Sequence, residues 1–429
     1  MKNKKRYNLI VAGGGPSGVA VAISAARQGL QVLLIEKNTY LGGAMTGGLV
    51  MPMMRSIQNE NSSILDELLS RLAQTGDSIN YQNNNRGWFN PERVKMLLDM
   101  MVQEAGIDVL FDSVVLSVDY LKNKIEGIEC FNKSGRIYYE ADFFVDATGD
   151  ADLASLAGVG FESGNYGKNQ PVSLRFNMGG VDLEKFANWL ENFDQDRNVT
   201  TVFRDNNQIH LSTACTFDNA NWALRPLFEK AIEEGVLEYK DANYFQIFTV
   251  AGQNGAIGFN CPRVPFDVNP LDANDTTKAL MWARGAIFRL ADFCKKYLLG
   301  FEKAYVSNIA NNLGIRDSRR IKGKYILKEE DICRIMPNPV AKSDYPFDVH
   351  STQKDKSILS RRAYYEIPLE SLLVNEFDNL AVCGRCISCD FLMQSSLRIQ
   401  PTCFAMGESL GLHIAKVLSD KLSGKFNLF

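Results

Sequence analysis

The alternation of apolar and polar segments near the N-terminus predicts a strand, a helix and a second strand. Residues 7–12 form a short apolar run, typical of a strand buried on both faces. Residues 17–28 are small and rich in alanine, as expected of a helix that packs closely on a sheet, and Gly29 follows as a helix-ending residue. Residues 31–36 predict the second strand. A strand, a helix and a parallel strand in succession form the right-handed crossover of a doubly wound α/β fold.

Further periodic segments extend this pattern along the chain. Val94, Leu97, Leu98 and Met101 recur at helical spacing and predict an amphipathic helix over 91–104. The other expected elements are a strand at 107–111, three short antiparallel runs (a β-meander) within 113–142, an apolar strand at 143–147, a long helix at 276–299, a strand at 379–383 and a closing helix at 401–418.

The composition changes after residue 165, where Asn, Asp and aromatic residues become frequent. We therefore expect a first domain made of residues 1–165 and 365–429. A second domain, made of residues 166–364 with mixed strand and helix patterns, is expected to be inserted into it. A length of 429 residues agrees with two or three domains.

The overall composition is that of an ordinary globular protein. It has 45% hydrophobic and 23% charged residues, which excludes intrinsic disorder as the main state of the chain. A formal net charge of −3 argues against a nucleic-acid binder that works through a broad basic surface. The nine cysteines lack the spacing of a disulfide framework and favour a reducing compartment, so we expect a cytoplasmic protein. The apolar run after the basic N-terminus is too short for a signal peptide, and no run of about 18 apolar residues predicts a membrane span.

A glycine-rich turn joins the first predicted strand to the first predicted helix, with the spacing Gly13-x-Gly15-x-x-Gly18. The first glycine permits the tight turn, the second lets the backbone approach a pyrophosphate, and the third lets helix and strand pack closely. Free N–H groups at the helix N-terminus favour phosphate. Glu36 ends the second strand, where it can accept hydrogen bonds from ribose hydroxyls. Strand, helix and acid together predict a dinucleotide site rather than a structural turn.

The turn alone does not distinguish FAD from NAD, but three later features favour FAD. Residues 41–48 are rich in glycine, which lets the backbone approach the rest of a long dinucleotide. The β-meander is followed by an apolar strand that leads into residues 145–150. Gly384 and Arg385 precede a helix that starts at Pro401, and a helix N-terminus can stabilise negative charge on a reduced flavin.

These motifs resemble those of the flavoprotein superfamily with a glutathione-reductase-type FAD fold. More narrowly, the chain is similar over nearly its whole length to the FAD-dependent oxidoreductase family, whose distant relatives include fumarate reductase and succinate dehydrogenase flavoproteins. Besides the FAD motifs, the resemblance rests on residues 146–154, 313–321 and 384–388, of which the last two segments are specific to the family. It implies an α/β fold: a doubly wound, Rossmann-like FAD-binding domain with a β-meander and an inserted α+β substrate or cap domain.

The resemblance also implies which residues contact the cofactor. In this chain they are Gly13, Gly15, Pro16, Ser17, Gly18, Glu36, Lys37, Gly42, Gly43, Val114, Thr148, Gly149, Asp152, Gly384, Arg385, Gln400 and Met406 or Gly407. No histidine lies near Gly42 and Gly43, where some relatives attach flavin covalently, so noncovalent FAD is expected. The chain departs from the family pattern at Asp317, where Glu is usual, and at 389–392, where relatives often carry Ala-Thr-His-Glu. If that histidine touches substrate in relatives, the substrate or the reaction differs here.

Three arginines lie within five residues in the expected substrate domain, namely Arg316, Arg319 and Arg320. Guanidinium groups bind carboxylates bidentately and stay protonated, so Arg316 and Arg319 are candidate catalytic residues that anchor an anionic substrate. The alternative is a structural ion-pair cluster with the acidic residues Asp317, Glu329 and Glu330. Arg398, just before the closing helix, is a third candidate, with a scaffold role as its alternative.

Cys383, Cys386 and Cys389 repeat at a spacing found in iron–sulfur and zinc sites, with Cys403 beyond them. Cys383 falls in an apolar strand, and alternate strand residues point to opposite faces. We therefore interpret these residues as buried thiols near a cofactor and predict no metal, with a metal site or a redox pair as alternatives.

The sequence thus predicts an FAD-dependent oxidoreductase that acts on a small organic substrate, carboxylate-bearing by the argument from the arginines, through hydride or electron transfer at flavin N5. An NAD-dependent dehydrogenase and a flavin-binding protein without catalysis of its own are the alternatives. The expected partners are this small molecule and an electron donor or acceptor that the sequence does not identify, with no nucleic acid and no membrane span. The oligomeric state does not follow from the sequence.

Overall fold

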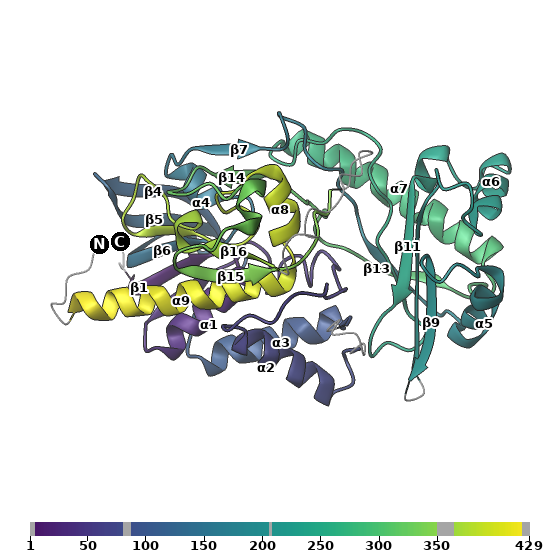
Figure 1. Cartoon of the computed structure of the whole chain (residues 1–429), viewed down its shortest axis with the longest axis horizontal. Coiled ribbons are helices and arrows are strands. Elements are labelled where there is room, and N and C mark those ends of the chain that lie inside the picture. Colours follow the sequence, from purple (N-terminus) through teal and green to yellow (C-terminus); the bar gives the residue numbers. More distant parts are fainter. Residues whose placement is uncertain (1–4, 80–86, 206–207, 350–363, 423–429) are drawn as a thin grey trace.

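A seven-stranded sheet forms one end of the molecule (Figure 1). The computed structural model describes residues 5–79, 87–205, 208–349 and 364–422. The strands of this sheet are β1 (Lys5–Ala12), β2 (Val32–Ile35), β3 (Asp108–Leu110), β4 (Val114–Leu121), β5 (Lys124–Asn132), β6 (Gly135–Asp146) and β17 (Leu380–Val382). β3, β2, β1, β6 and β17 pair in parallel, and β4, β5 and β6 form an antiparallel meander. The predicted doubly wound sheet with a β-meander is confirmed.

β6 differs from the prediction, because the third meander run and the apolar strand after it form one strand of 12 residues. Its first half pairs antiparallel with β5, and its second half pairs in parallel with β17 along the same edge. β1 follows it along the other edge. The strand passes from a partly exposed edge to a position buried on both sides, so its polarity changes midway and mimics two strands.

Helices α1 (Pro16–Arg27), α2 (Ser63–Gln74), α3 (Pro91–Glu104) and α9 (Gln400–Leu422) pack beside this sheet (Figure 1). α1 and α9 approach closely because two glycines of α9 face α1. A β-carbon on Gly407 would lie 2.3 Å from Ser17 O, and one on Gly411 would lie 2.6 Å from Val21 O. The first and last helices of the chain are thereby held together beside the predicted nucleotide turn.

Replacing Gly411 with alanine should destabilise the protein by about 1–3 kcal/mol, as overpacked cores do. The new β-carbon would lie 1.9 Å from Ser24 Oγ and 2.6 Å from Val21 O, so the two helices must move apart. Gly285→Ala is the matched control, because its β-carbon would meet only Arg289 Nη1 at 3.4 Å. Alanine in an exposed helix interior should stabilise by about 0.5–1 kcal/mol. Urea unfolding of both variants checks the opposite signs.

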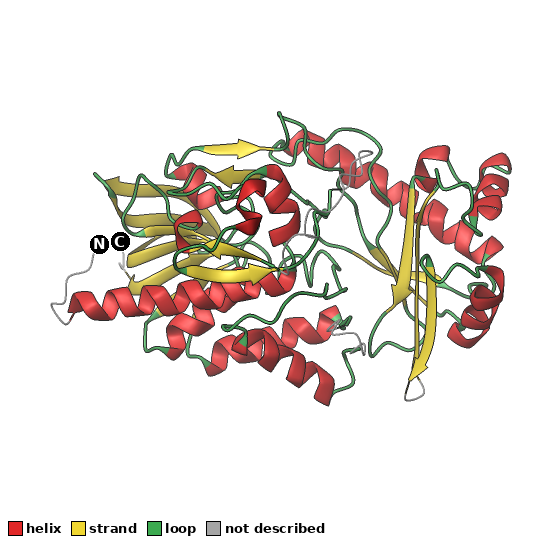
Figure 2. Ribbon diagram, viewed as in Figure 1, coloured by secondary structure: helices red, strands yellow, loops and turns green. Residues whose placement is uncertain are grey.

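A six-stranded antiparallel sheet forms the other end of the molecule (Figure 2). Its strands, in spatial order, are β13 (Tyr305–Ile309), β8 (Phe176–Gly179), β12 (Ile257–Phe259), β11 (Tyr244–Thr249), β10 (Gln208–Thr216) and β9 (Thr200–Asp205). Helices α5 (Leu183–Phe193), α6 (Arg225–Glu233) and α7 (Ala273–Tyr297) pack on it. Phe186, Phe228 and Phe293, one from each helix, share a buried core with Phe245 of β11. α7 was predicted at 276–299, and the other helices of this part were not.

The remaining strands form two short pairs. β14 (Arg319–Ile321) pairs with β7 (Phe161–Ser163), and β15 (Pro339–Ser343) pairs with β16 (Tyr365–Pro368). Two further helices are α4 (Asp152–Leu156) and α8 (Phe391–Leu397). The division into 1–165 with 365–429 and 166–364 stays a prediction. In the described parts of the chain, no helix has the length and apolarity needed to cross a membrane.

Candidate cofactor and substrate site

The glycine turn opens at the N-terminus of α1. Gly13 has a φ of +101°, and a β-carbon on it would lie 2.4 Å from Ala147 O. A β-carbon on Gly18 would lie 1.8 Å from Gly13 O, whereas one on Gly15 would meet no atom within 4 Å. Pro16 starts the helix and no side chain caps it, so its first-turn N–H groups are available. This open cradle at a helix N-terminus fits the pyrophosphate of a dinucleotide.

Glu36 is held rigidly at the end of β2. Its Oε2 accepts a hydrogen bond from Gly14 N (2.6 Å), and its Oε1 accepts from Asn38 N (2.8 Å) and Asn38 Nδ2 (2.6 Å). A carboxylate has about four acceptor positions, so it can still accept from a ribose hydroxyl. Ser113 N donates to Glu36 O (3.1 Å), which brings the exposed Val114 close to this acid. Two predicted contact residues far apart in sequence therefore lie together.

The glycine-rich segment after β2 folds back over the turn. Gly42 N donates to Gly14 O (2.8 Å), and a β-carbon on Gly43 would approach Gly15 Cα to 3.2 Å. Gly42 and Gly43 both have positive φ, at +92° and +51°. The backbone of this segment therefore forms a wall beside the open cradle at Gly15.

The same segment continues to the start of α9. Gln400 Nε2 donates to Val50 O (2.6 Å), while Gln400 Oε1 and Thr402 Oγ1 are buried without a partner among the described residues. Gly384 lies beside α1, since a β-carbon on it would be 2.8 Å from Ser17 Oγ. Orphaned polar atoms at a helix N-terminus fit a polar ring edge such as that of a flavin.

The turn after β6 is fixed by Asp146. Its Oδ1 accepts from Thr148 N (3.0 Å) and Thr148 Oγ1 (2.7 Å), and its Oδ2 accepts from Ala154 N (2.8 Å). Burial raises the pKa of Asp146 to about 6, against the lowering effect of these donors. Asp152 N donates to Thr148 Oγ1 (2.9 Å), and Lys37 Nζ lies 3.9 Å from Asp152 Oδ2. Three predicted contacts, Lys37, Thr148 and Asp152, thus meet at one place.

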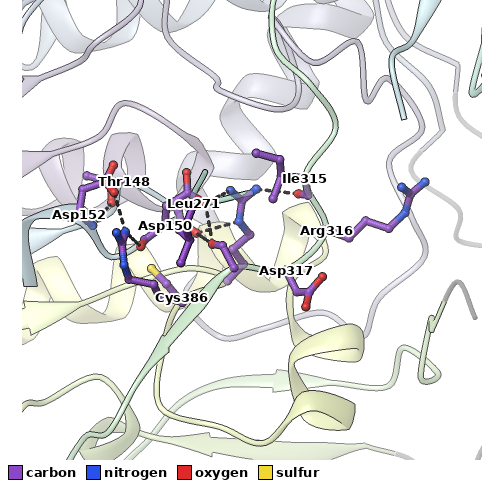
Figure 3. A network of polar contacts seen from close by, with 12 residues as sticks. Thr148, Asp150, Asp152, Leu271, Ile315, Arg316, Asp317 and Cys386 are labelled. Atoms are coloured by element: carbon purple, nitrogen blue, oxygen red, sulfur yellow. Dashed lines mark hydrogen bonds and ion pairs between the residues drawn. The ribbon is translucent and has the colours of Figure 1, made fainter. Parts of the chain in front are cut away.

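Arg385 ties this turn to Ile315, in the segment that leads to Arg316. Figure 3 shows the polar network around Asp150. Arg385 Nε donates to Gly149 O (2.7 Å), its Nη1 to Ile315 O (2.9 Å) and its Nη2 to Asp150 Oδ1 (2.7 Å). Ser318 Oγ also donates to Asp150 Oδ1 (2.6 Å). Burial alone would raise the pKa of Asp150, but Arg385, Ser318 and the more distant charge of Lys37 lower it overall. All three hydrogen-bonding edges of this guanidinium are used within the protein.

Arg316 and Arg398 belong to a cluster of four arginines, which we call the arginine cluster: Arg175, Arg263, Arg316 and Arg398. Arg398 Nη1 donates to Arg316 O (3.0 Å), and its Nη2 lies 3.4 Å from Asp348 Oδ2. Burial, followed by the charges of Arg398, Arg263 and Arg175, lowers the pKa of Arg316 to about 9. Burial also lowers the pKa of Arg175 to about 10 and that of Arg263 and Arg398. Arg175 and Arg263 belong to no motif, and sequence reasoning missed them.

Arg319 and Arg320 lie elsewhere. Arg319 Nη1 donates to Asp150 O (2.8 Å) and to Asp152 Oδ1 (2.9 Å). Arg320 is buried, and donates to Cys389 O (3.1 Å) and Gly164 O (2.9 Å). In Figure 3, Arg316 points away from the network that contains Asp150 and Asp152. Of the three predicted catalytic arginines, the structure brings Arg316 and Arg398 together and keeps Arg319 apart.

The alternative ion-pair cluster does not form as predicted. Asp317 accepts from Gln170 N (2.7 Å) and Asn169 Nδ2 (3.1 Å) rather than from a neighbouring arginine. Glu330 lies 4.0 Å from Lys328 Nζ, and no ion pair joins Glu329 or Glu330 to Arg316, Arg319 or Arg320 in the described chain.

The four cysteines of the C-terminal segment, Cys383, Cys386, Cys389 and Cys403, are buried and free. Burial raises the pKa of all four thiols, that of Cys403 to about 11, so they are protonated at neutral pH. Within the described residues no group of three or more His, Cys, Asp or Glu side chains is arranged to hold a metal ion.

Met406 and Gly407 are both buried rather than open to solvent. Met406 is fully buried, and Gly407 faces Ser17 O at the first turn of α1. Gly407 therefore contacts the first turn of α1, which directly follows the glycine turn.

A polar cavity of about 460 Å³ borders the same loop. It is lined by Thr46, Gly47 and Leu49, by the first turns of α3, and by Asn177, Gln253 and residues 307–311. Its ammonium group, Lys95 Nζ, is paired with Glu92 Oε1 at 2.9 Å. Unlike the arginine cluster, this cavity gains no excess positive charge from Lys95.

Known proteins resemble this chain in part. A thiamine thiazole synthase of Methanococcus aeolicus is 28% identical over 156 residues, which are 34% of this chain and 57% of that protein. A digeranylgeranylglycerophospholipid reductase of Methanococcoides burtonii is 22% identical over 197 residues, 42% of this chain and 47% of that protein. The chain thus spans about half the length of these relatives. A p-nitrophenol 4-monooxygenase structure from Pseudomonas putida covers 99% of this chain, which covers 82% of it, at 11% identity and a TM-score of 0.49.

The sequence model of one family matches nearly the whole chain. It is described as FAD dependent oxidoreductase and covers residues 8–424. This match confirms the predicted enzyme class and FAD as the cofactor, and it disfavours the NAD-dependent alternative. The cradle at Gly15, the glycine wall and the orphaned polar atoms at α9 fit that cofactor. This chain belongs to the FAD dependent oxidoreductase family.

Proposed function

We propose that this protein oxidises or reduces a small organic, carboxylate-bearing molecule by hydride or electron transfer at N5 of FAD, and that it works in the cytoplasm. The observation that carries the proposal is the open cradle at Gly15, with the backbone of Gly43 beside it, together with the buried, unpaired Gln400 Oε1 at the start of α9. Bound FAD would supply the redox chemistry, and the protein would supply orientation and electrostatics.

The roles proposed for the chain's own residues follow their positions. The α1 N–H groups, next to Gly15, would bind the pyrophosphate, and Glu36 would bind ribose. Arg385 would hold the turn at Gly149 and so shape the middle of the site. The remaining proposed cofactor contacts are Gly13, Pro16, Ser17, Gly18, Lys37, Gly42, Gly43, Val114, Thr148, Asp152, Gly384, Gln400, Met406 and Gly407.

Arg316 and Arg398 are proposed to face the substrate, since they share the arginine cluster. Arg319 is proposed to act at the nucleotide end, because its guanidinium is paired with Asp152 at 2.9 Å. Residues 166–364, with the six-stranded sheet, would then cover the flavin and select the substrate.

The test is anaerobic bleaching of the bound flavin by a panel of small acids, alcohols and amines. Purified protein should carry about one FAD per chain, and at least one acid should bleach it faster than its amide. Flavin that no compound reduces, together with slow reoxidation by oxygen, would favour a flavin-binding protein without catalysis. A colourless protein that takes up no added FAD would contradict the cofactor site itself.

A further inference from the structure

The polar cavity of about 460 Å³ beside Thr46 is lined by two parts of the chain. One part is the loop of Thr46 with the first turn of α3, and the other is Gln253 with residues of β8 and β13. Two hydrogen bonds join these parts: Asn312 N donates to Gly47 O (3.2 Å), and Gln253 Nε2 donates to Asn90 Oδ1 (3.1 Å). The cavity is therefore preformed, and its volume falls within the range of about 300–1,000 Å³ that is typical of small-molecule sites.

Asn177 of β8 carries an unsatisfied polar atom of this lining. The residue is 3% exposed, and its Oδ1 is buried without a hydrogen-bond partner in the described parts of the chain. Its neighbours Phe176 and Met178 belong to the apolar core on one face of the sheet, so Asn177 points to the opposite face, where the cavity lies. A buried acceptor without a donor is costly, so this position favours a ligand that donates a hydrogen bond.

A β-bulge in β13 adds two polar side chains to the same cavity. Ser307 and Asn308 both line it, although successive residues of a regular strand point to opposite faces. The pairing of β13 with β8 shifts between Val306 and Asn308, which leaves Ser307 as the extra residue and Asn308 opposite Asn177. Ser307 Oγ donates to the backbone oxygen of Asn177 (3.2 Å). Bulges commonly redirect side chains beside functional sites, and this one concentrates hydrogen-bonding groups around Asn177.

The lining is polar without a net charge. Among the described residues that form it, the charged ones are Lys95 and Glu92, which pair with each other at 2.9 Å. The other polar side chains carry hydroxyl or amide groups: Thr46, Asn177, Gln253, Ser307, Asn308 and Asn311. A side-chain amide both donates and accepts hydrogen bonds, as an alcohol hydroxyl does. No aromatic ring belongs to the described lining, so a planar ring ligand would find no surface for stacking.

We infer that this cavity binds an uncharged compound with several hydroxyl groups, such as a sugar alcohol, and that one of these hydroxyls donates to Asn177 Oδ1. Hydroxyls match the amides of the lining in both directions, whereas a hydrocarbon would leave Asn177 unsatisfied. The bound compound would touch the loop of Thr46, whose earlier residues Gly42 and Gly43 border the FAD cradle. The site therefore adjoins the cofactor, but the inference does not depend on the substrate proposed for the flavin.

The experiment is a ligand-observed NMR titration of the FAD-loaded protein with sorbitol, hexanediol, succinamide and glucamine. Hexanediol keeps the carbon chain of sorbitol and only its terminal hydroxyls, succinamide offers amides instead, and glucamine adds a terminal ammonium. Sorbitol should bind about 10-fold or more tightly than hexanediol and succinamide, because hydrogen bonds to buried groups are lost with them. Glucamine should bind no more tightly than sorbitol. Binding is measured directly, because polyols stabilise proteins without a specific site.

Asn177→Leu should weaken sorbitol binding about 10-fold or more. The melting temperature of the ligand-free variant should not fall, because leucine has a similar size and removes an unpaired buried acceptor. Ser307→Trp, a larger side chain at an exposed position of the lining, should block sorbitol without replacing a buried group. Asn192→Leu is the matched control, because Asn192 is exposed on α5 and its amide donates to Asn188 O (2.7 Å). This control should bind sorbitol like the natural protein.

The flavin content of each protein separates this inference from the proposed function. A protein with full flavin content that binds sorbitol no better than hexanediol or succinamide would overturn the polyol site and leave the flavoenzyme in place. Glucamine that binds more tightly than sorbitol would overturn the uncharged class. Sorbitol binding that survives both Asn177→Leu and Ser307→Trp would overturn the assignment to this cavity. A lower melting temperature of ligand-free Asn177→Leu would show that Asn177 supports the fold, and would overturn its role as an acceptor held open for a ligand.

Discussion

Replacing Gly15 with aspartate should abolish FAD binding and leave the fold intact. Gly15 has φ −72° and ψ −177°, a conformation that any residue adopts, and its β-carbon would meet no atom within 4 Å. α1 lacks a side-chain cap, so the introduced carboxylate would accept a hydrogen bond from a first-turn N–H. An N-cap of this kind stabilises a helix by about 0.5–2 kcal/mol. The same carboxylate would occupy and repel the site of the pyrophosphate.

The expected size is a loss of at least about 100-fold in FAD affinity, which is about 2.7 kcal/mol. It is measured by titrating flavin-free protein with FAD, and the melting temperature of the flavin-free variant should not fall. Gly160→Asp is the matched control, because a β-carbon there would meet only the side chain of Lys322, at 3.7 Å. A Gly15→Asp protein that keeps its flavin would show that the dinucleotide does not cross this turn. A lower melting temperature would instead attribute the loss to misfolding.

The parts of the fold that could be predicted from the sequence are those whose structure is determined by residues close together in the chain. Helix α3 has the predicted bounds, because Asn90 caps it, Pro91 begins it and its apolar positions recur at helical spacing. The turn at Gly13 could be recognised for the same reason, because all the glycines of its motif lie within one short segment of the chain. β6 was split in two because its partner changes midway from β5 to β17, which the local sequence does not reveal.

The substrate side was harder to predict, because it is assembled from distant segments. Arg175, Arg263, Arg316 and Arg398 come from four parts of the chain, and nothing near Arg175 or Arg263 in the sequence marks either as special. Closeness in sequence also led to a wrong grouping of residues. Arg316 and Arg319 are three residues apart, yet Arg319 lies in strand β14 and pairs with Asp152. Residues close in an extended segment need not share a face, so their common charge does not give them a common ligand.

Arg385→Met should destabilise the protein by about 3 kcal/mol, because it removes one partner of a largely buried ion pair and leaves the other. The two side chains of the pair, Arg385 and Asp150, are 22% and 15% exposed and 2.7 Å apart. Methionine keeps the bulk of the side chain, but the carbonyls of Gly149 and Ile315 also lose their donor. Denaturant unfolding gives the change, with flavin content measured alongside.

The pH dependence of the unfolding free energy at acid pH tests whether the ion pair is the cause of this loss. Arg385 helps to hold the pKa of Asp150 below its ordinary value, so the pair stabilises the fold above about pH 4 and this contribution is lost as the pH falls further. The difference in unfolding free energy between Arg385→Met and the natural protein should therefore be largest near neutrality and shrink at acid pH.

Arg6→Met is the control for this prediction. Its pair with Asp142 has a similar distance, 2.6 Å, but the arginine is 64% exposed, so the cost in stability should stay below about 1 kcal/mol. Equal costs for the two substitutions would mean that Arg385 and Asp150 contribute no more than a surface pair does.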